Sequence, residues 1–137
     1  MKNKNKNKVD LYPALWVIVW DVAITAIYQP KEYWQGNLRM VNEGNPIGYI
    51  CMTTNQYGLF YLAFIWLVAV VLFAKILPYS LSKTFLLFVF ISHNIGIVNW
   101  MLFKNHFVFA ILFILLNSLF FDRKEICSNS KTTLFKN

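Results

Sequence analysis

The sequence predicts an all-α integral membrane protein built as a bundle of four transmembrane helices. Hydrophobic residues make up 58% of its 137 residues and charged residues only 14%, against roughly 25% charged residues in a soluble domain. A soluble fold of this size could not cover so much apolar surface. Aromatic residues contribute 18% of the chain, which excludes a disordered protein. The apolar residues also gather in four blocks that run far past strand length, so helices are expected.

The first predicted helix covers residues 11–28. A cleaved signal peptide is the competing interpretation, because it also combines a basic start with an apolar run. Against it stand the length of the run, its two tryptophans and Asp21. The sequence also offers no convincing small-x-small cleavage site. We therefore expect this helix to remain in the protein.

Three further blocks predict the other transmembrane helices, at residues 57–77, 84–103 and 106–121. A helix of about 20 residues crosses the 30 Å hydrocarbon core, with about 17 residues as the lower end of the range. The fourth block is short, so it must include His106 or Asp122 at its ends. Together the four helices define a membrane domain over residues 11–121.

The connections between the helices differ in length. One long loop, Gln29–Gln56, joins the first two helices, and tight turns at Pro78–Lys83 and at Lys104–His106 join the others. A basic tail, residues 1–10, and a polar tail, residues 122–137, flank the membrane domain. A loop of 28 residues is uncommon unless it has a function.

The basic residues predict the orientation of the protein in a cell membrane. Ten of the 13 Lys and Arg residues fall on the side of the two termini and three on the other side, namely Lys31, Arg39 and Lys104. An excess of this size places both termini in the cytoplasm and Gln29–Gln56 outside. The net charge of +7 is then explained by membrane insertion and by anionic lipid. No further basic patch accompanies the lysine-rich start, so we expect no nucleic-acid partner.

An acidic residue inside the first helix is the first candidate for a functional group. Asp21 is deep enough to be costly, and such residues usually face the bundle interior and find a partner. Thr25 follows one turn later on the same face. The alternative interpretation is that Asp21 only holds the bundle together through an interhelical hydrogen bond.

The third predicted helix carries a polar stripe. At 100° per residue, Ser92, His93, Gly96 and Asn99 share about one third of its circumference. His93 lies about 14 Å along its helix from the cytoplasmic end and Asp21 about 15 Å along its own. Because the depths match, we expect these two side chains to approach within direct or one-water hydrogen-bonding range. Thr25 and Asn99 would lie above them in a polar cleft that opens outward.

The long loop contains a rigid turn at its centre. In the run Glu43-Gly-Asn45-Pro46, proline fixes its own φ and forces Asn45 to be extended. The turn would then present the Glu43 and Asn45 side chains in a set direction and close the outer end of the cleft. The alternative is an ordinary solvated turn.

These features together resemble a known family. Asp21-x-x-x-Thr25, the Glu43-Gly-Asn45-Pro46 run and an Asn near the end of a third helix are similar to small prokaryotic four-helix membrane proteins classed as a domain of unknown function. The resemblance covers roughly residues 15–102. It implies the four-helix fold and this choice of site residues, and it implies no reaction.

The first functional hypothesis is a polar site that binds a cation, a proton or a lipid head group. Asp21, Glu43 and His93 supply two carboxylates and one imidazole, a set suited to a divalent cation. Asp21 and His93 could equally relay protons or act in general acid–base catalysis. The two histidines differ in depth by about 20 Å, which argues against haem.

The second hypothesis is a structural or accessory subunit of a larger membrane complex. Aromatic helix surfaces would then contact lipid, a second copy of the chain or other subunits, and the polar stripe would serve as packing glue. Cys51 and Cys127 lie on opposite sides of the membrane in the predicted topology. They cannot pair within one chain and have no metal-site spacing.

Overall fold

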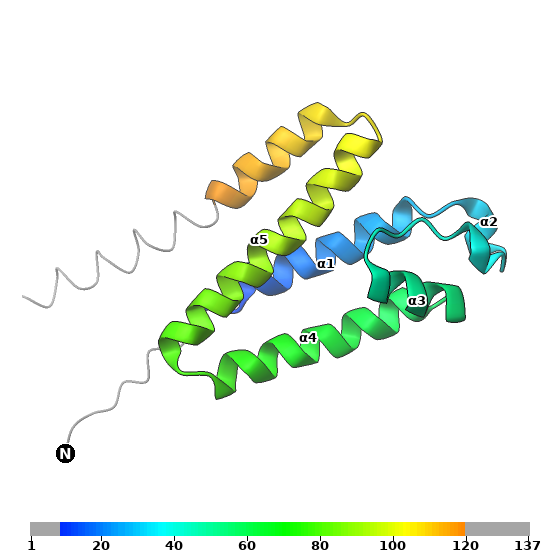
Figure 1. Cartoon of the computed structure of the whole chain (residues 1–137). Helices are drawn as coiled ribbons and strands as arrows, with labels where there is room; N and C mark the ends of the chain where they lie inside the picture. The colour runs from blue at the N-terminus through cyan, green and yellow to red at the C-terminus, as the bar shows by residue number, and fades with distance from the viewer. Residues whose placement is uncertain (1–8, 120–137) are drawn as a thin grey trace, which may run out of the picture. The chain divides into compact units, whose positions relative to one another are not determined.

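The computed structural model describes residues 9–119, and the chain divides into two compact units, Met1–Ile97 and Val98–Asn137. Within the described range every regular element is helical and no strand occurs, which confirms the predicted all-α class. A helix at Phe107–Leu119 follows the labelled elements. The labelled elements in Figure 1 are α1 (Tyr12–Ile27), α2 (Lys31–Trp34), η1 (Leu38–Met40), α3 (Pro46–Thr54), α4 (Gly58–Ile76) and α5 (Tyr79–Phe103).

Two helices are long and apolar enough to cross a membrane. They are α4 with 19 residues and α5 with 25 residues, or about 29 Å and 38 Å in length. The helices α1 and Phe107–Leu119 are also apolar but shorter. The bounds of α1 and α4 agree within one residue with the predicted 11–28 and 57–77. The predicted tails lie almost entirely outside the described residues, as do the last two positions of the predicted 106–121 helix.

The start of the third predicted helix is wrong by five residues, because α5 begins at Tyr79. The connection between α4 and α5 is therefore only Leu77 and Pro78, and the turn predicted at Pro78–Lys83 does not exist. The backbone N–H of Ser82 donates to the Pro78 carbonyl at 2.9 Å, within the first helical turn. The Ser82 hydroxyl donates to the Ala74 carbonyl at 2.9 Å. Polar residues in this segment thus pair within the helix and with α4, which allows the helix to continue through them.

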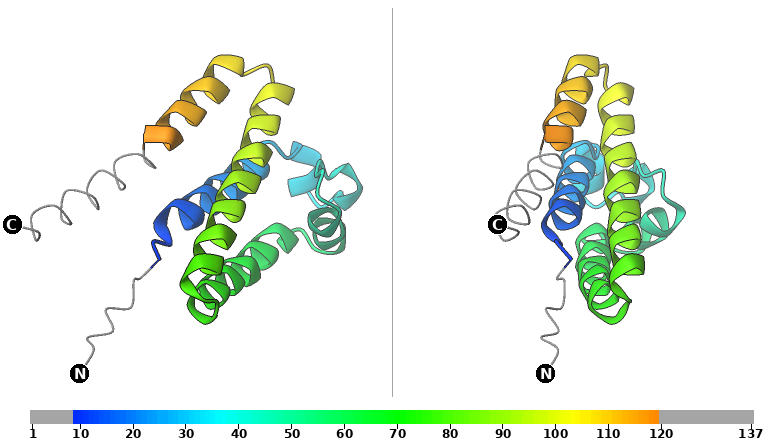
Figure 2. Two further views of the ribbon diagram at one scale, coloured as in Figure 1. Left: turned by 60° about the vertical axis from the view of Figure 1, so that its left-hand side comes forward. Right: turned by 90° about the vertical axis from the view of Figure 1, so that its left-hand side faces the viewer.

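The predicted long loop contains three helical elements rather than irregular chain. Figures 1 and 2 show α2, η1 and α3 gathered where α1 ends and α4 begins. The fully buried Tyr33 packs with Met52 and Leu59 in a small core. The Tyr33 hydroxyl donates to the Gln56 carbonyl at 2.9 Å. The helix α3 lies so close to the start of α4 that a Cβ on Gly58 would be 2.0 Å from the Cys51 carbonyl oxygen.

Asn45 begins α3 as its N-cap. Its backbone is extended (φ −80°, ψ 120°), as predicted for the residue before Pro46, and its side chain accepts a hydrogen bond from the Ile47 N–H at 3.0 Å. Proline suits the first helical position because the N–H it lacks would have no intrahelical partner there. The predicted rigid turn is thus the start of a helix.

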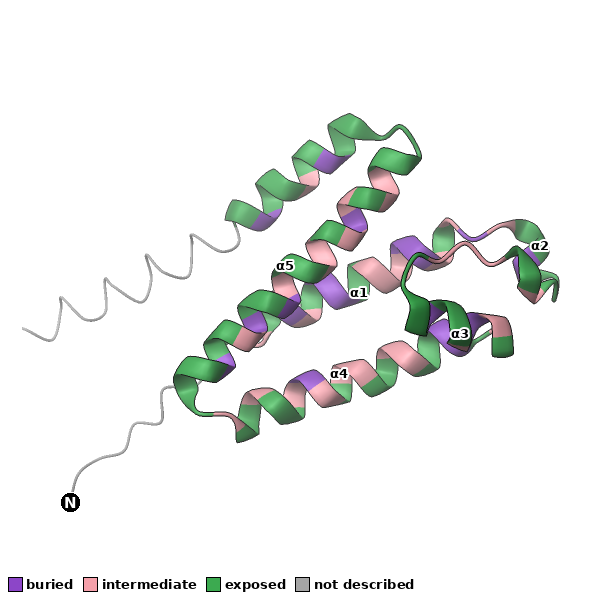
Figure 3. Cartoon of the chain, viewed as in Figure 1, coloured by how far each residue is buried: buried purple, intermediate pink, exposed green. Residues whose placement is uncertain are grey.

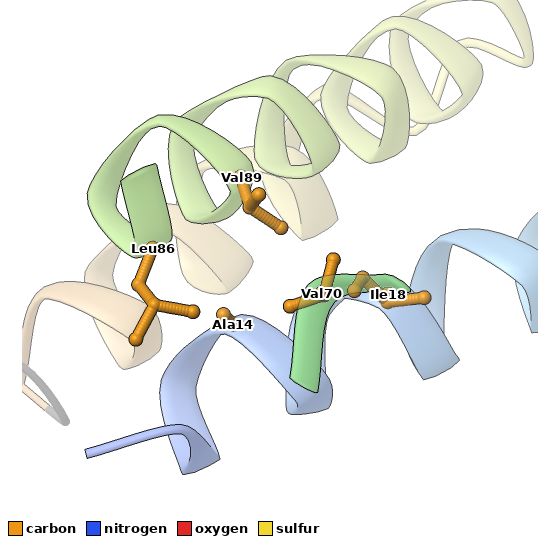
Figure 4. Packing of buried hydrophobic residues seen from close by; sticks show 5 residues of the cluster. All are labelled: Ala14, Ile18, Val70, Leu86 and Val89. Atoms are coloured by element: carbon orange, nitrogen blue, oxygen red, sulfur yellow. The ribbon is translucent and has the colours of Figure 1, made fainter. Parts of the chain in front are cut away.

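The main apolar core of the first unit joins three helices. Figure 4 shows Ala14 and Ile18 of α1 against Val70 of α4 and Leu86 and Val89 of α5. All five side chains are buried. Small and branched residues at these points allow close helix approach. The core therefore packs α1 and α5 together about one helical turn before Asp21 along α1.

Apolar residues cover the outer faces of α4 and α5. Figure 3 shows exposed positions along both helices. On α4 the exposed residues recur at helical spacing, which marks a continuous stripe. The largest exposed apolar side chains of the two helices include Phe60, Phe64, Ile65, Leu72, Ile76, Phe88, Ile91 and Ile95.

The second unit contains the end of α5 and the predicted turn at Lys104–His106. Asn105 has a positive φ of 61°, a conformation that Asn tolerates at helix ends. The His106 N–H donates to the Met101 carbonyl at 2.8 Å, which closes the turn. The prediction of a tight turn here is confirmed.

Candidate functional site

Asp21 and His93 meet between α1 and α5. The His93 Nδ1 atom is 2.6 Å from Asp21 Oδ2, in the range of a charge-assisted hydrogen bond. The side chains of His93 and Asp21 are 20% and 22% exposed, respectively. Their expected approach within direct hydrogen-bonding range is confirmed. The pair links two helices at a point where solvent or a small species can still reach it.

Trp66 of α4 is the third member of this network. Its indole N–H donates to His93 Nε2 at 3.0 Å. Since an indole nitrogen can only donate, His93 Nε2 must accept and carries no proton. A neutral imidazole has one N–H, which is therefore at Nδ1 and is donated to Asp21. Trp66, His93 and Asp21 thus form one directed chain of hydrogen bonds across α4, α5 and α1.

This chain limits what His93 can do as a base. General base catalysis needs a free ring lone pair within reach of a substrate proton. The Nε2 lone pair of His93 faces Trp66, and the Nδ1 proton faces Asp21. In this arrangement His93 has no lone pair free for general base catalysis, and it can take up a proton at Nε2 only when the Trp66 bond opens.

Gly96 provides space for the Asp21 carboxylate. It lies one turn after His93 on α5, and a Cβ at this position would be 3.0 Å from Asp21 Oδ1. That spacing is tighter than nearly all real Cβ contacts. A side chain here would displace the carboxylate, so this glycine lets α1 and α5 approach at the pair.

Gln29 fixes the region between the end of α1 and the start of α4, called the outer region because the sequence predicts it on the outer side of the membrane. Its buried side-chain amide donates to the carbonyl of Asn42 at 2.6 Å and accepts from the N–H of Asn42 at 2.9 Å. The same amide nitrogen donates to the Thr25 carbonyl at 3.2 Å. Every donor and acceptor of the Gln29 side chain is used except one acceptor lone pair. This double contact holds the backbone next to Glu43.

Glu43 lies at the outer end of the site. One of its carboxylate oxygens, Oε1, accepts a hydrogen bond from the Asn45 N–H at 2.7 Å. Its side chain packs on Gly48, where a Cβ would be 3.0 Å from the Glu43 Cγ. Burial raises the pKa of Glu43, the nearby negative charge of Asp21 raises it further, and backbone hydrogen bonds from Asn45 and Gly44 partly oppose both effects. Glu43 is therefore close enough to Asp21 for the two charges to interact.

The raised pKa of Glu43 predicts a specific pH dependence of stability. The folded protein holds this proton more tightly than the unfolded chain does, so the folded state loses stability as the pH rises above 4.5, the ordinary value. In Glu43→Gln this loss should be absent, and the stability advantage of the variant should grow with pH. Thermal unfolding measured at pH values below and above 4.5 tests this prediction, with the exposed Glu32→Gln as control. Parallel profiles for wild type and Glu43→Gln would contradict the prediction.

The other predicted site residues are placed differently. Thr25 is buried, whereas Ser92 and Asn99 are exposed, and Asn99 belongs to the second compact unit. Asn94, which points away from the predicted stripe, donates to the Phe90 carbonyl at 2.7 Å on its own helix. Of the predicted site residues, the structure pairs Asp21 with His93 and Asn45 with Glu43.

The proposed divalent metal set is not formed. No group of three or more His, Cys, Asp or Glu side chains within the described residues is arranged to hold a metal ion. The physical reason lies in His93, because a metal ligand needs a free imidazole lone pair and the Nε2 lone pair accepts from Trp66. The metal interpretation of Asp21, Glu43 and His93 therefore stays a prediction that this arrangement does not favour.

Sequence analysis does not identify Trp66 or Gln29 as site residues. The position of Trp66 within its helix is nevertheless a usable signal. Tryptophans of membrane proteins concentrate at the interfaces, and Trp66 lies near the middle of α4. A buried indole N–H in that position needs an acceptor. No comparable local signal marks Gln29, whose partner is a backbone group 13 residues away.

Comparison with family models, with curated proteins and with solved structures finds no match to this chain. The resemblance to small four-helix membrane proteins therefore stays a prediction.

Proposed function

We propose that this chain is a four-span protein of the cell membrane, with both termini in the cytoplasm, and that its Asp21–His93 pair binds and releases a proton. The observation that carries the proposal is the 2.6 Å contact between His93 Nδ1 and Asp21 Oδ2. It lies between helices whose outer faces are apolar. Ionisable residues within membrane helices are typical of proton relays. Histidine is the side chain that ordinarily changes charge between pH 5 and 8.

The exposure of the long helices supports the membrane location. Only 11% of the apolar window of α4 and 17% of that of α5 are buried inside the structure, whereas the core helix of a soluble protein is mostly buried. Neither helix is at the N-terminus, where a signal sequence would be. In the proposal, α1 and Phe107–Leu119 supply the other two spans.

The outer region supports access from outside. The distribution of basic residues places residues 29–56 on that side. Gln29 holds Asn42 at the end of α1, and this brings the Glu43 carboxylate near Asp21. The Glu43 carboxylate near Asp21 favours a cation such as a proton over an anion at that point, while Lys31 and Arg39 balance the charge of residues 29–56 as a whole.

Counting protons tests the proposal directly. In membrane-reconstituted protein, acidification over the pH range in which the protein stays folded should add about one proton to the Asp21–His93 pair. The His93→Gln variant should then take up about one proton fewer per chain than wild type, as read with an indicator dye in weakly buffered solution. The exposed Glu32→Gln provides the matched control and should equal wild type. Equal uptake by wild type and His93→Gln would contradict the proposal.

An accessory subunit of a larger membrane complex is the second candidate. The observation in its favour is that His93 uses both ring nitrogens inside the chain, as packing glue would. In that case His93 stays neutral in the folded protein, and the purified complex has a mass well above that of the chain in its detergent micelle. Proton counting and solution mass together distinguish the two functions.

A further inference from the structure

The hydrogen bond from Trp66 has a consequence for where a second proton can enter the imidazole of His93. The Nδ1 atom already carries a proton, so a second one must go to Nε2. Nε2 faces the indole N–H at 3.0 Å. Two N–H donors cannot share that space, because neither has a lone pair to accept from the other. Protonation of Nε2 and the Trp66–His93 bond are therefore mutually exclusive.

We infer that Trp66 is a positioning residue that keeps Nε2 of His93 unprotonated, and that a second proton enters the ring only when the bond between α4 and α5 opens. This inference rests on the proton site proposed above. It assigns to α4 a role that the Asp21–His93 pair alone does not require. Trp66 would thus act as a latch on proton binding.

The charged groups near His93 belong to α1 and the outer region and not to α4. This difference predicts which helix moves when the ring takes up a proton. From α1, Asp21 faces Nδ1, and Glu43 of the outer region adds a carboxylate near Asp21. From α4, the group that faces the ring is the uncharged indole of Trp66. An imidazolium would keep and strengthen its bond to Asp21 and lose its bond to Trp66. Proton binding would therefore tighten α1 against α5 and release α4.

The two helices α4 and α5 remain in contact near the turn that joins them. The Ser82 hydroxyl bonds the Ala74 carbonyl at 2.9 Å next to the short turn between α4 and α5. This contact involves no group that titrates near neutral pH. The two helices would separate at Trp66 and His93 while they remain joined at Ser82.

The tautomer of His93 provides the first test. In protein with ¹⁵N-labelled histidine and His106→Gln to leave a single signal, nitrogen NMR at neutral pH should show the Nδ1–H form as the main tautomer, with a small share of the Nε2–H form. Trp66→Phe keeps an aromatic ring and loses the donor, so the share of the Nε2–H form should rise about fivefold to tenfold. Trp20→Phe, which changes an exposed indole one residue from Asp21, should leave the wild-type ratio. An unchanged ratio in a folded Trp66→Phe protein would overturn the inference.

A second test uses the protein without the Trp66 substitution and stays informative if that variant does not fold. As the pH is lowered, the imidazolium signal of His93 should appear together with an upfield shift of the Trp66 indole proton, which reports loss of its hydrogen bond. An imidazolium that forms while the indole proton stays bonded would overturn the latch and leave the proton site intact. If no imidazolium forms at any pH at which the protein is folded, the proposed function fails, and the ratio in Trp66→Phe still decides the positioning role.

Discussion

Replacing either member of the Asp21–His93 pair should destabilise the first unit by about 2 to 3 kcal/mol, below the largest values for fully buried pairs. Asp21→Ala leaves the His93 Nδ1–H without its acceptor. His93→Phe leaves both the Asp21 carboxylate and the Trp66 N–H without partners, so its effect should be the larger of the two. The expected cost lies below that maximum because both side chains are about one fifth exposed.

The double variant Asp21→Ala/His93→Phe should recover part of the loss, because no carboxylate is then left unpaired. A coupling free energy of about 1 to 2 kcal/mol is expected from a double-mutant cycle of unfolding in detergent. Glu32→Ala combined with His93→Phe serves as the control cycle and should be additive, since Glu32 is exposed on α2. Coupling indistinguishable from zero in the Asp21 cycle would show that the contact contributes nothing to stability.

Gly58→Ala should be the most damaging single-methyl change in the outer region. The new Cβ would lie 2.0 Å from the Cys51 carbonyl oxygen, 2.4 Å from the Cys51 carbonyl carbon and 3.0 Å from the Met52 nitrogen. These are backbone atoms, which cannot move aside as a flexible side chain can. We expect a loss of about 3 kcal/mol, at the upper end for overpacking. Alanine's better helix propensity would offset up to about 1 kcal/mol of that loss.

Gly44→Ala is the matched control for this prediction, because no atom lies within 4 Å of its expected Cβ. Hydrogen exchange of the α3 amides measures the effect where it arises, since α3 must leave the start of α4 to admit the methyl group. Faster exchange in Gly58→Ala and unchanged exchange in Gly44→Ala are expected. Equal exchange in both variants would contradict the close packing of α3 on α4.

The sequence predicts well the helices whose ends are set by the change from apolar to polar residues. Apolar runs predicted α1 and α4 within one residue, because the ends of these runs coincide with polar or turn-forming residues. The start of α5 was missed because Ser80, Ser82 and Lys83 look like a polar turn. The Ser82 hydroxyl instead bonds the Ala74 carbonyl of α4, a tertiary contact that the local pattern does not contain.

The candidate site also has one part that the sequence predicts and another that it does not. The pairing of Asp21 with His93 is confirmed, although the predicted depth of His93 was counted from residue 84 and α5 begins at Tyr79, about 7.5 Å earlier along the helix. The cost of an unpaired carboxylate between apolar helices is therefore the stronger reason for the pairing. Ser92 was placed in the same stripe by angle alone, yet it is exposed, because the angular position of a residue on one helix does not determine which neighbour covers it. The Gln29–Asn42 contact depends on the path of the outer chain, which no periodicity describes.

The Gln29–Asn42 contact also determines which parts of the connection between α1 and α4 can vary in length. A side-chain amide that pairs both ways with a backbone peptide closes a ring of the intervening residues, and closure entropy grows only slowly with ring size. The number of residues at exposed points of this ring, such as Gly36, is therefore nearly free to vary, while Tyr33 keeps its place in the small core. The seven-residue span from Asn42 to Gly48 has no such freedom, because Glu43 must return to pack on Gly48. Extra residues should thus be tolerated between Gln29 and Asn42 and excluded between Asn42 and Gly48, so the outer region combines a segment of adjustable length with one of fixed length.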